Sequence, residues 1–227
     1  MRPLPQNRPH AIDVGTSPEI GALAGLSDQT LLVLMLTRGE SCTDPDRVAA
    51  DLFERFGSLS AIASADLPEL ARIDGLGPVA LTDLKLLRLL CERLARGEAA
   101  KRPVISTSSA LLAYVRIALA EEPREQFRTL FLDRRNQLMR DELIAHGTVD
   151  HAPVYPREVV RRALGLSASS IILVHNHPSG DPEPSRADIE MTRRIVEAAK
   201  VFEIEVHDHL VVGRNGTASF RALGLMS

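Results

Sequence analysis

The sequence predicts two modules, a small all-helical domain followed by an α/β domain. The first hundred residues lack β-branched runs, and glycines divide them into apolar stretches at helical spacing. After residue 101, short apolar strands alternate with amphipathic helices, which is the order typical of an α/β domain. The segment 96–108, RGEAAKRPVISTS, carries charge, Gly, Pro and Ser with little periodicity. It therefore predicts a linker between the two modules.

The composition excludes several classes of protein. The chain has 227 residues, of which 44% are hydrophobic and 25% charged, as in ordinary globular proteins. Its apolar stretches are too short to span a bilayer and its first residues form no apolar signal segment, so we expect a cytoplasmic protein without membrane contact. Two cysteines exclude a disulfide framework. A net charge of −3 gives no overall attraction to nucleic acid, so any such contact must be local.

The N-terminal part begins with a predicted flexible tail over residues 1–20, and the helical domain is expected over residues 21–100. Helices are predicted at residues 27–36, 45–56, 67–71 and 78–94. The last of these helices carries leucines one turn apart, namely Leu81, Leu84, Leu87 and Leu90. This spacing predicts a buried stripe.

The C-terminal domain is expected over residues 105–227. Its predicted helices cover residues 109–120, a segment opened by Pro156, and residues 185–201. Its predicted strands cover residues 127–133, 138–147, 171–174 and 204–212. The third strand is wholly apolar and is expected to be buried on both faces.

The segment 175–188, HNHPSGDPEPSRAD, combines a strand end, a rigid loop and the start of a helix. His175 and His177 are two positions apart, so on a strand their side chains share one face. The prolines and glycine then turn the chain back, and Ser185 is placed to cap a helix whose first turn contains Asp188. We therefore expect both imidazoles and this carboxylate to meet at one point.

Two imidazoles and one carboxylate suit Zn²⁺ better than Mg²⁺ or Ca²⁺, and three protein ligands leave the fourth tetrahedral position to water. The pattern predicts one Zn²⁺ per chain and hydrolysis by a metal-activated water. Ser185 is also placed to donate its hydroxyl to a developing oxyanion. Asp181, in the loop, is the rival carboxylate ligand. A capping box alone would explain Ser185 and Asp188, but it would not explain either histidine.

A second histidine pair lies on the last predicted strand, where His207 and His209 flank Asp208. No carboxylate follows them at metal-binding spacing. We interpret this pair as structural residues, or as residues that support the ligands, and not as metal ligands.

The spacing HxHx₇SxxD resembles the zinc signature of the JAB/MPN, or JAMM, metallopeptidase-like domains, and the full string resembles the RadC branch of that family. Further segments resemble RadC-like proteins in the same order: LARIDGLGPVALTDLKL, EQFRTLFLDRRNQLMRDELIAHGT, PREVVRRAL and DHLVVG. The resemblance implies a JAB/MPN domain over residues 105–227, with a cytidine-deaminase-like layered sheet. It also implies a helix-hairpin-helix-like region in the N-terminal module.

The same resemblance implies a catalytic glutamate that serves as general base and then as general acid. Glu125 matches its position, because it immediately precedes the strand FRTLFLD. Glu142 and Glu158 are the alternatives. The implied activity is that of a zinc-dependent metallopeptidase or isopeptidase acting on a protein or peptide, with a link to DNA repair or recombination.

The turn Gly75-Leu76-Gly77 resembles the hairpin of a helix-hairpin-helix unit, which brings backbone N–H groups close to a DNA phosphate. Lys85 and Arg88 are the nearby cations. A protein-binding hairpin and a plain tight turn are the other interpretations. Two alternative functions also stay open, a zinc-dependent nuclease acting on DNA and a non-catalytic DNA-processing adaptor. The physiological substrate and the oligomeric state are not predicted.

Overall fold

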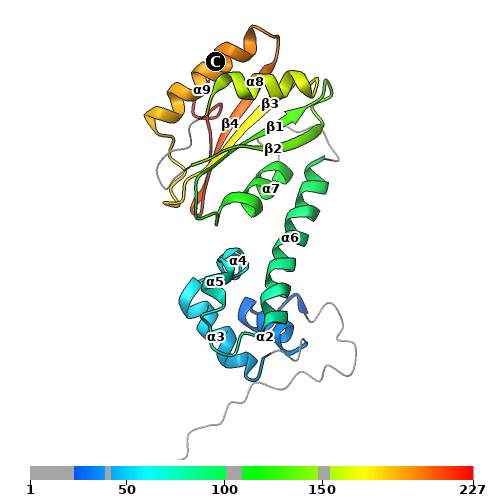
Figure 1. Ribbon diagram of the computed structural model, residues 1–227, viewed down its shortest axis with the longest axis vertical. Helices are drawn as coiled ribbons and strands as arrows, with labels where there is room; N and C mark the ends of the chain where they lie inside the picture. Colours follow the sequence, from blue (N-terminus) through cyan, green and yellow to red (C-terminus); the bar gives the residue numbers. More distant parts are fainter. Residues whose placement is uncertain (1–22, 39–41, 101–108, 148–153, 227) are drawn as a thin grey trace, which may run out of the picture.

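The computed structural model describes residues 23–38, 42–100, 109–147 and 154–226. Figure 1 shows a helical N-terminal module and a C-terminal sheet domain, joined by one long helix. The predicted fold class is confirmed. The tail predicted over residues 1–20 lies outside the described residues.

The N-terminal module is built from short helices that enclose one apolar core. These helices are α2 (Asp28–Arg38), α3 (Pro45–Phe56), α4 (Leu59–Ser64), α5 (Leu67–Leu70) and α6 (Pro78–Ala100). The sequence analysis missed α4, because six residues are too few to show helical periodicity. This helix depends on the Ser58 cap, whose hydroxyl accepts from the N–H of Ala61, and on the burial of Ile62 in the core.

The helix α6 is longer than predicted, because it continues through residues 96–100 of the expected linker. Ala99 is buried against Leu111 and Tyr114 in the core of the C-terminal domain. This packing extends the helix across a charge-rich segment. The rest of the predicted linker, 101–108, lies outside the described residues. No described helix, α6 included, combines the length and apolar character needed to cross a membrane.

The leucine stripe predicted on α6 is only partly correct. Leu84 is fully buried, Leu81 and Leu87 are half-buried, and Leu90 is 49% exposed. Residues three apart on a helix of 3.6 residues per turn step back by about 60° each time. The row of leucines therefore winds from the buried side of α6 to its exposed side.

The C-terminal domain contains a five-stranded sheet with the order β2-β1-β3-β4-β5. The chain forms α7 (Ser109–Leu119), β1 (Gln126–Leu132), β2 (Leu138–His146), α8 (Pro156–Gly165), β3 (Ser170–Asn176), α9 (Arg186–Lys200), β4 (Glu205–Gly213) and β5 (Gly216–Ser219). Only β3 and β4 are parallel, and the other neighbours are antiparallel. The sequence analysis missed β5, whose four half-buried residues show no alternation of burial.

Helices cover both faces of the sheet, with α8 and α9 on one side and α7 on the other (Figure 1). Every residue of β3 is buried, as its apolar sequence predicted. Ile171 and Leu173 pack on the α8–α9 side, whereas Ile172 and Val174 pack on the α7 side. β3 is also the central strand of the sheet. Successive side chains at its end are therefore directed to opposite covering layers.

A buried polar group joins α7 to the sheet. The hydroxyl of Tyr114 donates to the carboxylate of Asp141 on β2, and Arg128 on β1 donates to the same carboxylate over 2.9 Å. Burial, reinforced by the charge of Asp141, raises the pKa of Tyr114, so this phenol stays a hydrogen-bond donor. The contact satisfies a carboxylate that would be costly to bury without donors.

Replacement of Tyr114 by Phe removes one donor from this buried carboxylate. We expect the free energy of unfolding, measured by urea titration, to fall by about 1–3 kcal/mol. Tyr155→Phe is the matched control, because Tyr155 is the only other tyrosine and is 53% exposed. Equal stability of the two variants would contradict the structural role of the Tyr114 hydroxyl.

Candidate metal centre

Three predicted site residues converge at the C-terminal end of β3. The ligand atoms of His175, His177 and Asp188 all lie within 4.8 Å of one another. The two Nε2 atoms are 3.0 Å apart. Oxygens of Asp188 lie 3.4 Å from the Nε2 of His175 and 3.5 Å from that of His177. This arrangement could hold a metal ion.

The loop after β3 is held against the end of β4, and this contact positions His177. The N–H of His177 donates to the carbonyl of Val212 over 2.9 Å, and its Nδ1 donates to the carbonyl of Asp181 over 2.8 Å. Gly180 adopts a left-handed φ of 93°. Its carbonyl oxygen would lie only 2.3 Å from a Cβ at Gly213, so the close approach requires glycine there.

A capping box orients Asp188 on the first turn of α9. The hydroxyl of Ser185 accepts from the N–H of Asp188 over 3.1 Å, and an Asp188 oxygen accepts from the N–H of Ser185 over 2.7 Å. Burial acts to raise the pKa of Asp188, but its interactions with both histidines and the hydrogen bond from Ser185 outweigh it and hold this pKa well below its ordinary value. Asp188 is therefore a carboxylate anion. The cap uses the oxygen of the Ser185 hydroxyl and leaves its hydrogen free to donate.

A chain of hydrogen bonds fixes the tautomer of His175. The Oγ1 of Thr192 lies 2.6 Å from the carbonyl oxygen of Asp188 and 2.6 Å from the Nδ1 of His209. A carbonyl only accepts, so the hydroxyl donates its single hydrogen there and must accept from the Nδ1–H of His209. The Nε2 of His209 then accepts from the Nδ1–H of His175 over 2.7 Å. When its ring is neutral, the Nε2 of His175 is thus left with a lone pair.

The environment of His209 supports this assignment. Its ring is fully buried between Phe127 and Phe220, and burial lowers its pKa well below the ordinary value. A neutral ring has one N–H, as the chain requires. His209 thus supports a site residue without joining the three-residue group. The sequence analysis missed Thr192, which precedes His209 by 17 positions and carries no motif.

The facing nitrogens of His175 and His177 require a positive charge between them. The Nδ1 of His177 also donates to a carbonyl, so its Nε2 likewise carries the lone pair when the ring is neutral. Two lone pairs that face each other across 3.0 Å repel unless a proton or a metal cation lies between them. The hydrogen bond with Asp188 is the largest cause of the raised pKa of His177, which reflects the same demand for positive charge.

Glu125 lies where the sequence predicted, directly before β1. It is half-buried, and its charge contributes to the raised pKa of His177. The buried side chain of Asn176 forms hydrogen bonds with the residues on both sides of Glu125. Its Oδ1 accepts from the N–H of Gln126 over 2.8 Å, and its Nδ2 donates to the carbonyl of Arg124 over 3.1 Å. The sequence analysis missed Asn176, although its place between the two histidines was the available signal.

The alternative carboxylates are held by other partners. Glu142 is bound by Arg162 of α8, and this hydrogen bond is the largest cause of the lowered pKa of Glu142. Glu158 pairs with Arg161 on its own helix over 2.8 Å. The carboxylate of Asp181 accepts from a backbone N–H within its own turn. These described contacts favour Glu125 and Asp188 over their rivals.

The hairpin at Gly75 and Gly77 forms a tight turn in which Gly75 has a left-handed φ of 85°. The cations expected beside it are engaged elsewhere. Lys85 donates to the carbonyl of Ala63 over 3.2 Å, and Arg88 donates to the carbonyl of Ala118 over 3.2 Å. DNA contact at the hairpin therefore stays a prediction that would depend on backbone N–H groups.

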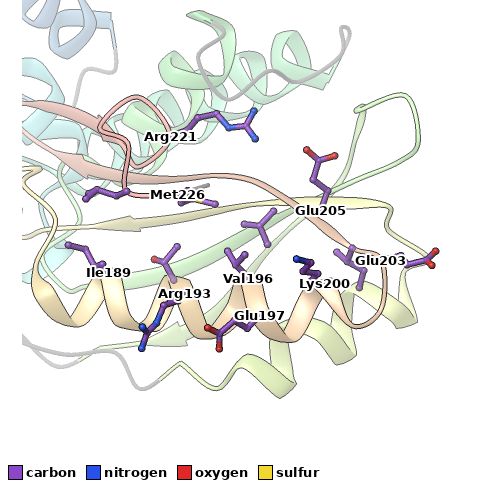
Figure 2. A pocket seen from close by; sticks show the side chains of 13 residues that line it. Ile189, Arg193, Val196, Glu197, Lys200, Glu203, Glu205, Arg221 and Met226 are labelled. Atoms are coloured by element: carbon purple, nitrogen blue, oxygen red, sulfur yellow. The ribbon is translucent and has the colours of Figure 1, made fainter.

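A groove of about 760 Å³ runs along α9, and Figure 2 shows its lining. Ile189 and Val196 of α9 form part of one wall, and Arg221 and Met226 come from the C-terminal segment. Thr192 also lines the groove. None of the five predicted site residues does, so the groove is separate from the three-residue group.

The chain matches a known protein-family model. The family model described as the RadC-like JAB domain matches residues 105–225, which is more than half of the chain. The matched segment contains the whole sheet and all five predicted site residues.

Replacement of Thr192 by Val tests the hydrogen-bond chain, because it removes the acceptor for the buried Nδ1–H of His209. We expect His209 to move its proton to Nε2, and His175 to lose its Nδ1–H pattern in turn. Two-bond ¹⁵N–¹H correlation spectra of the metal-free protein would report both tautomers. Thr192→Ser keeps the oxygen and should keep the wild-type pattern. An unchanged pattern in the Val variant would rule out the assigned chain.

Proposed function

The chain belongs to the family of RadC-like JAB-domain proteins, and from this premise we propose that it is a zinc-dependent hydrolase of amide or isopeptide bonds in a protein or peptide. The observation that carries the proposal is the 3.0 Å approach of the Nε2 atoms of His175 and His177 beside the carboxylate of Asp188. We propose these three residues as the ligands of one Zn²⁺ per chain.

The residues fit zinc in number, chemistry and spacing. Two nitrogens at about 2.0–2.1 Å from a tetrahedral zinc ion lie roughly 3.3 Å apart. The corresponding separation here is 3.0 Å, and the Asp188 oxygens lie 3.4 Å and 3.5 Å from the two nitrogens. The hydrogen bonds to His209 and Asp181 hold both rings by their other nitrogens, as is usual for histidines that bind zinc. Zinc bound there would polarise the attacked carbonyl and lower the pKa of its water to about 7.

The protein side chains supply the proton transfers. The Glu125 carboxylate accepts a proton from the attacking water as the new C–O bond forms, and it delivers this proton to the leaving nitrogen as the C–N bond breaks. Asn176 positions this residue by holding the peptide groups on both sides of it. The free hydrogen of the Ser185 hydroxyl donates to the carbonyl oxygen as negative charge develops there. The products are a carboxylate and an amine.

The structure favours amide hydrolysis over the two other functions considered. Nucleases commonly use two metals held by several acids. Within the described residues the candidate metal group has only one carboxylate. A DNA-processing adaptor would be helped by cations near the hairpin, but Lys85 and Arg88 are engaged inside the protein. A role in DNA repair or recombination would therefore depend on the backbone of residues 75–77.

The first prediction of the proposed function concerns the metal. His177→Ala removes one of the three ligands, so we expect the zinc content of purified protein to fall from about one ion per chain to a small fraction of that. Metal analysis by mass spectrometry would measure it. His207→Ala is the matched control, because His207 bonds to Asn136 outside the group. Undiminished zinc in His177→Ala would refute the proposed site.

The second prediction concerns the proposed base. Glu125→Gln removes the proton acceptor without removing a ligand, so we expect hydrolysis to fall by about 10²–10⁴-fold while zinc content is unchanged. A library of peptides and isopeptides would supply the substrate. Glu158→Gln, the variant of a rival base, should keep wild-type activity.

The same preparations would be incubated with single-stranded and branched DNA. DNA cleavage that is lost in Glu125→Gln, with no peptide or isopeptide cleaved by the wild type, would overturn the proposal in favour of a nuclease.

A further inference from the structure

The helix α6 is apolar on two opposite sides. Its inner side places Ala80 and Leu84 in the core of the helical module and Ala99 in the core of the sheet domain. Its outer side carries what we name the outer stripe, with exposed fractions of 50% for Val79, 49% for Leu86 and 49% for Leu90. A helix that is apolar on both sides is typically covered on both sides.

The outer stripe is straight along the helix. At 100° per residue, Val79, Leu86 and Leu90 fall within about 20° of one line, on the side opposite Arg88. In Figure 1 the middle of α6 has no described element on the side away from α4 and α5. Asp83 and Arg93 lie about 40° to either side of the same line.

We propose that the outer stripe is the interface with a second copy of this chain, with α6 packed antiparallel against α6 of that copy. A two-fold axis at the height of residue 88 brings Leu86 of each copy onto Leu90 of the other. The same axis brings Val79 onto Gly97. A Cβ at Gly97 would meet no atom within 4 Å, which leaves room for the opposing valine.

The charges beside the outer stripe select the antiparallel arrangement. The same axis brings Asp83 of each copy beside Arg93 of the other, so two opposite-charge pairs form. Neither residue has an ion-pair partner within the part of its own chain that the structure describes. A parallel pair would instead place Asp83 beside Asp83 and Arg93 beside Arg93, which is repulsive. The outer stripe is therefore complementary to itself in one orientation.

The proposed interface also determines which modules of the two copies are neighbours. Because α6 begins in the helical module and ends against the sheet domain, the antiparallel pair brings the helical module of each copy beside the sheet domain of the other. Two metal groups would then lie in one assembly.

Sedimentation velocity of the full-length protein tests the interface, with the wild type expected at twice the chain mass of 24.8 kDa. Asp83→Arg and Arg93→Asp should each weaken self-association by at least about tenfold, because each variant creates two like-charge pairs. An equimolar mixture of these variants should form a heterodimer in which every Arg faces an Asp. The double variant should dimerise as the wild type does. Arg194→Asp, an exposed change on α9, is the matched control.

Three results with the wild type and the charge variants would overturn the proposal. They are a wild-type chain that sediments as a monomer, Asp83→Arg dimers as tight as the wild type, and a mixture of the two charge variants that stays monomeric. A second variant, Leu86→Ser with Leu90→Ser, removes apolar contact instead of charge. It should give a monomer with an unchanged circular dichroism spectrum, and a persistent dimer would equally overturn the proposal.

Discussion

The candidate site depends on one chain of hydrogen bonds, which runs from the backbone carbonyl of Asp188 through Thr192 and His209 to His175. It joins three elements, α9, β4 and β3, and both of its ends lie on proposed metal ligands. Because each member has only one hydrogen to give, the direction of every bond follows from the carbonyl at one end. The Nδ1–H of His175 is therefore set by the fold, and its Nε2 faces His177 and Asp188 independently of a bound ion.

The pleat of β3 gives neighbouring residues two different tasks. His175 points to the α8–α9 layer and meets the carboxylate of α9, whereas the buried side chain of Asn176 reaches the segment before β1. That segment carries Glu125. Two consecutive residues of one central strand thus serve the site differently, because His175 is a proposed ligand and Asn176 positions the proposed base. Burial of the whole strand limits the movement of both side chains.

The sequence predicted the parts of the site that follow local rules. His175, His177 and Asp188 lie within fourteen residues, and strand alternation with a helix cap is enough to bring them together. Thr192 and Asn176 were missed because their partners, His209 and Arg124, are distant in sequence and are brought close only by the sheet. The exposed Leu90 and the helical end of α6 were mispredicted for a related reason, because tertiary packing decides which side of α6 is buried and where the helix ends.

The same packing connects the two modules more closely than a linker would. Arg88 of α6 donates to the carbonyl of Ala118 at the end of α7 and to the carboxylate of Glu122. The carbonyl of Glu122 accepts from the side chain of Asn176, which also forms hydrogen bonds with the residues on both sides of Glu125. Arg88, one of the two cations near the hairpin, thus fixes the helical module to the segment that carries the proposed base. The position of Glu125 therefore depends on the long helix as well as on the sheet, although the helix contributes none of the proposed ligands.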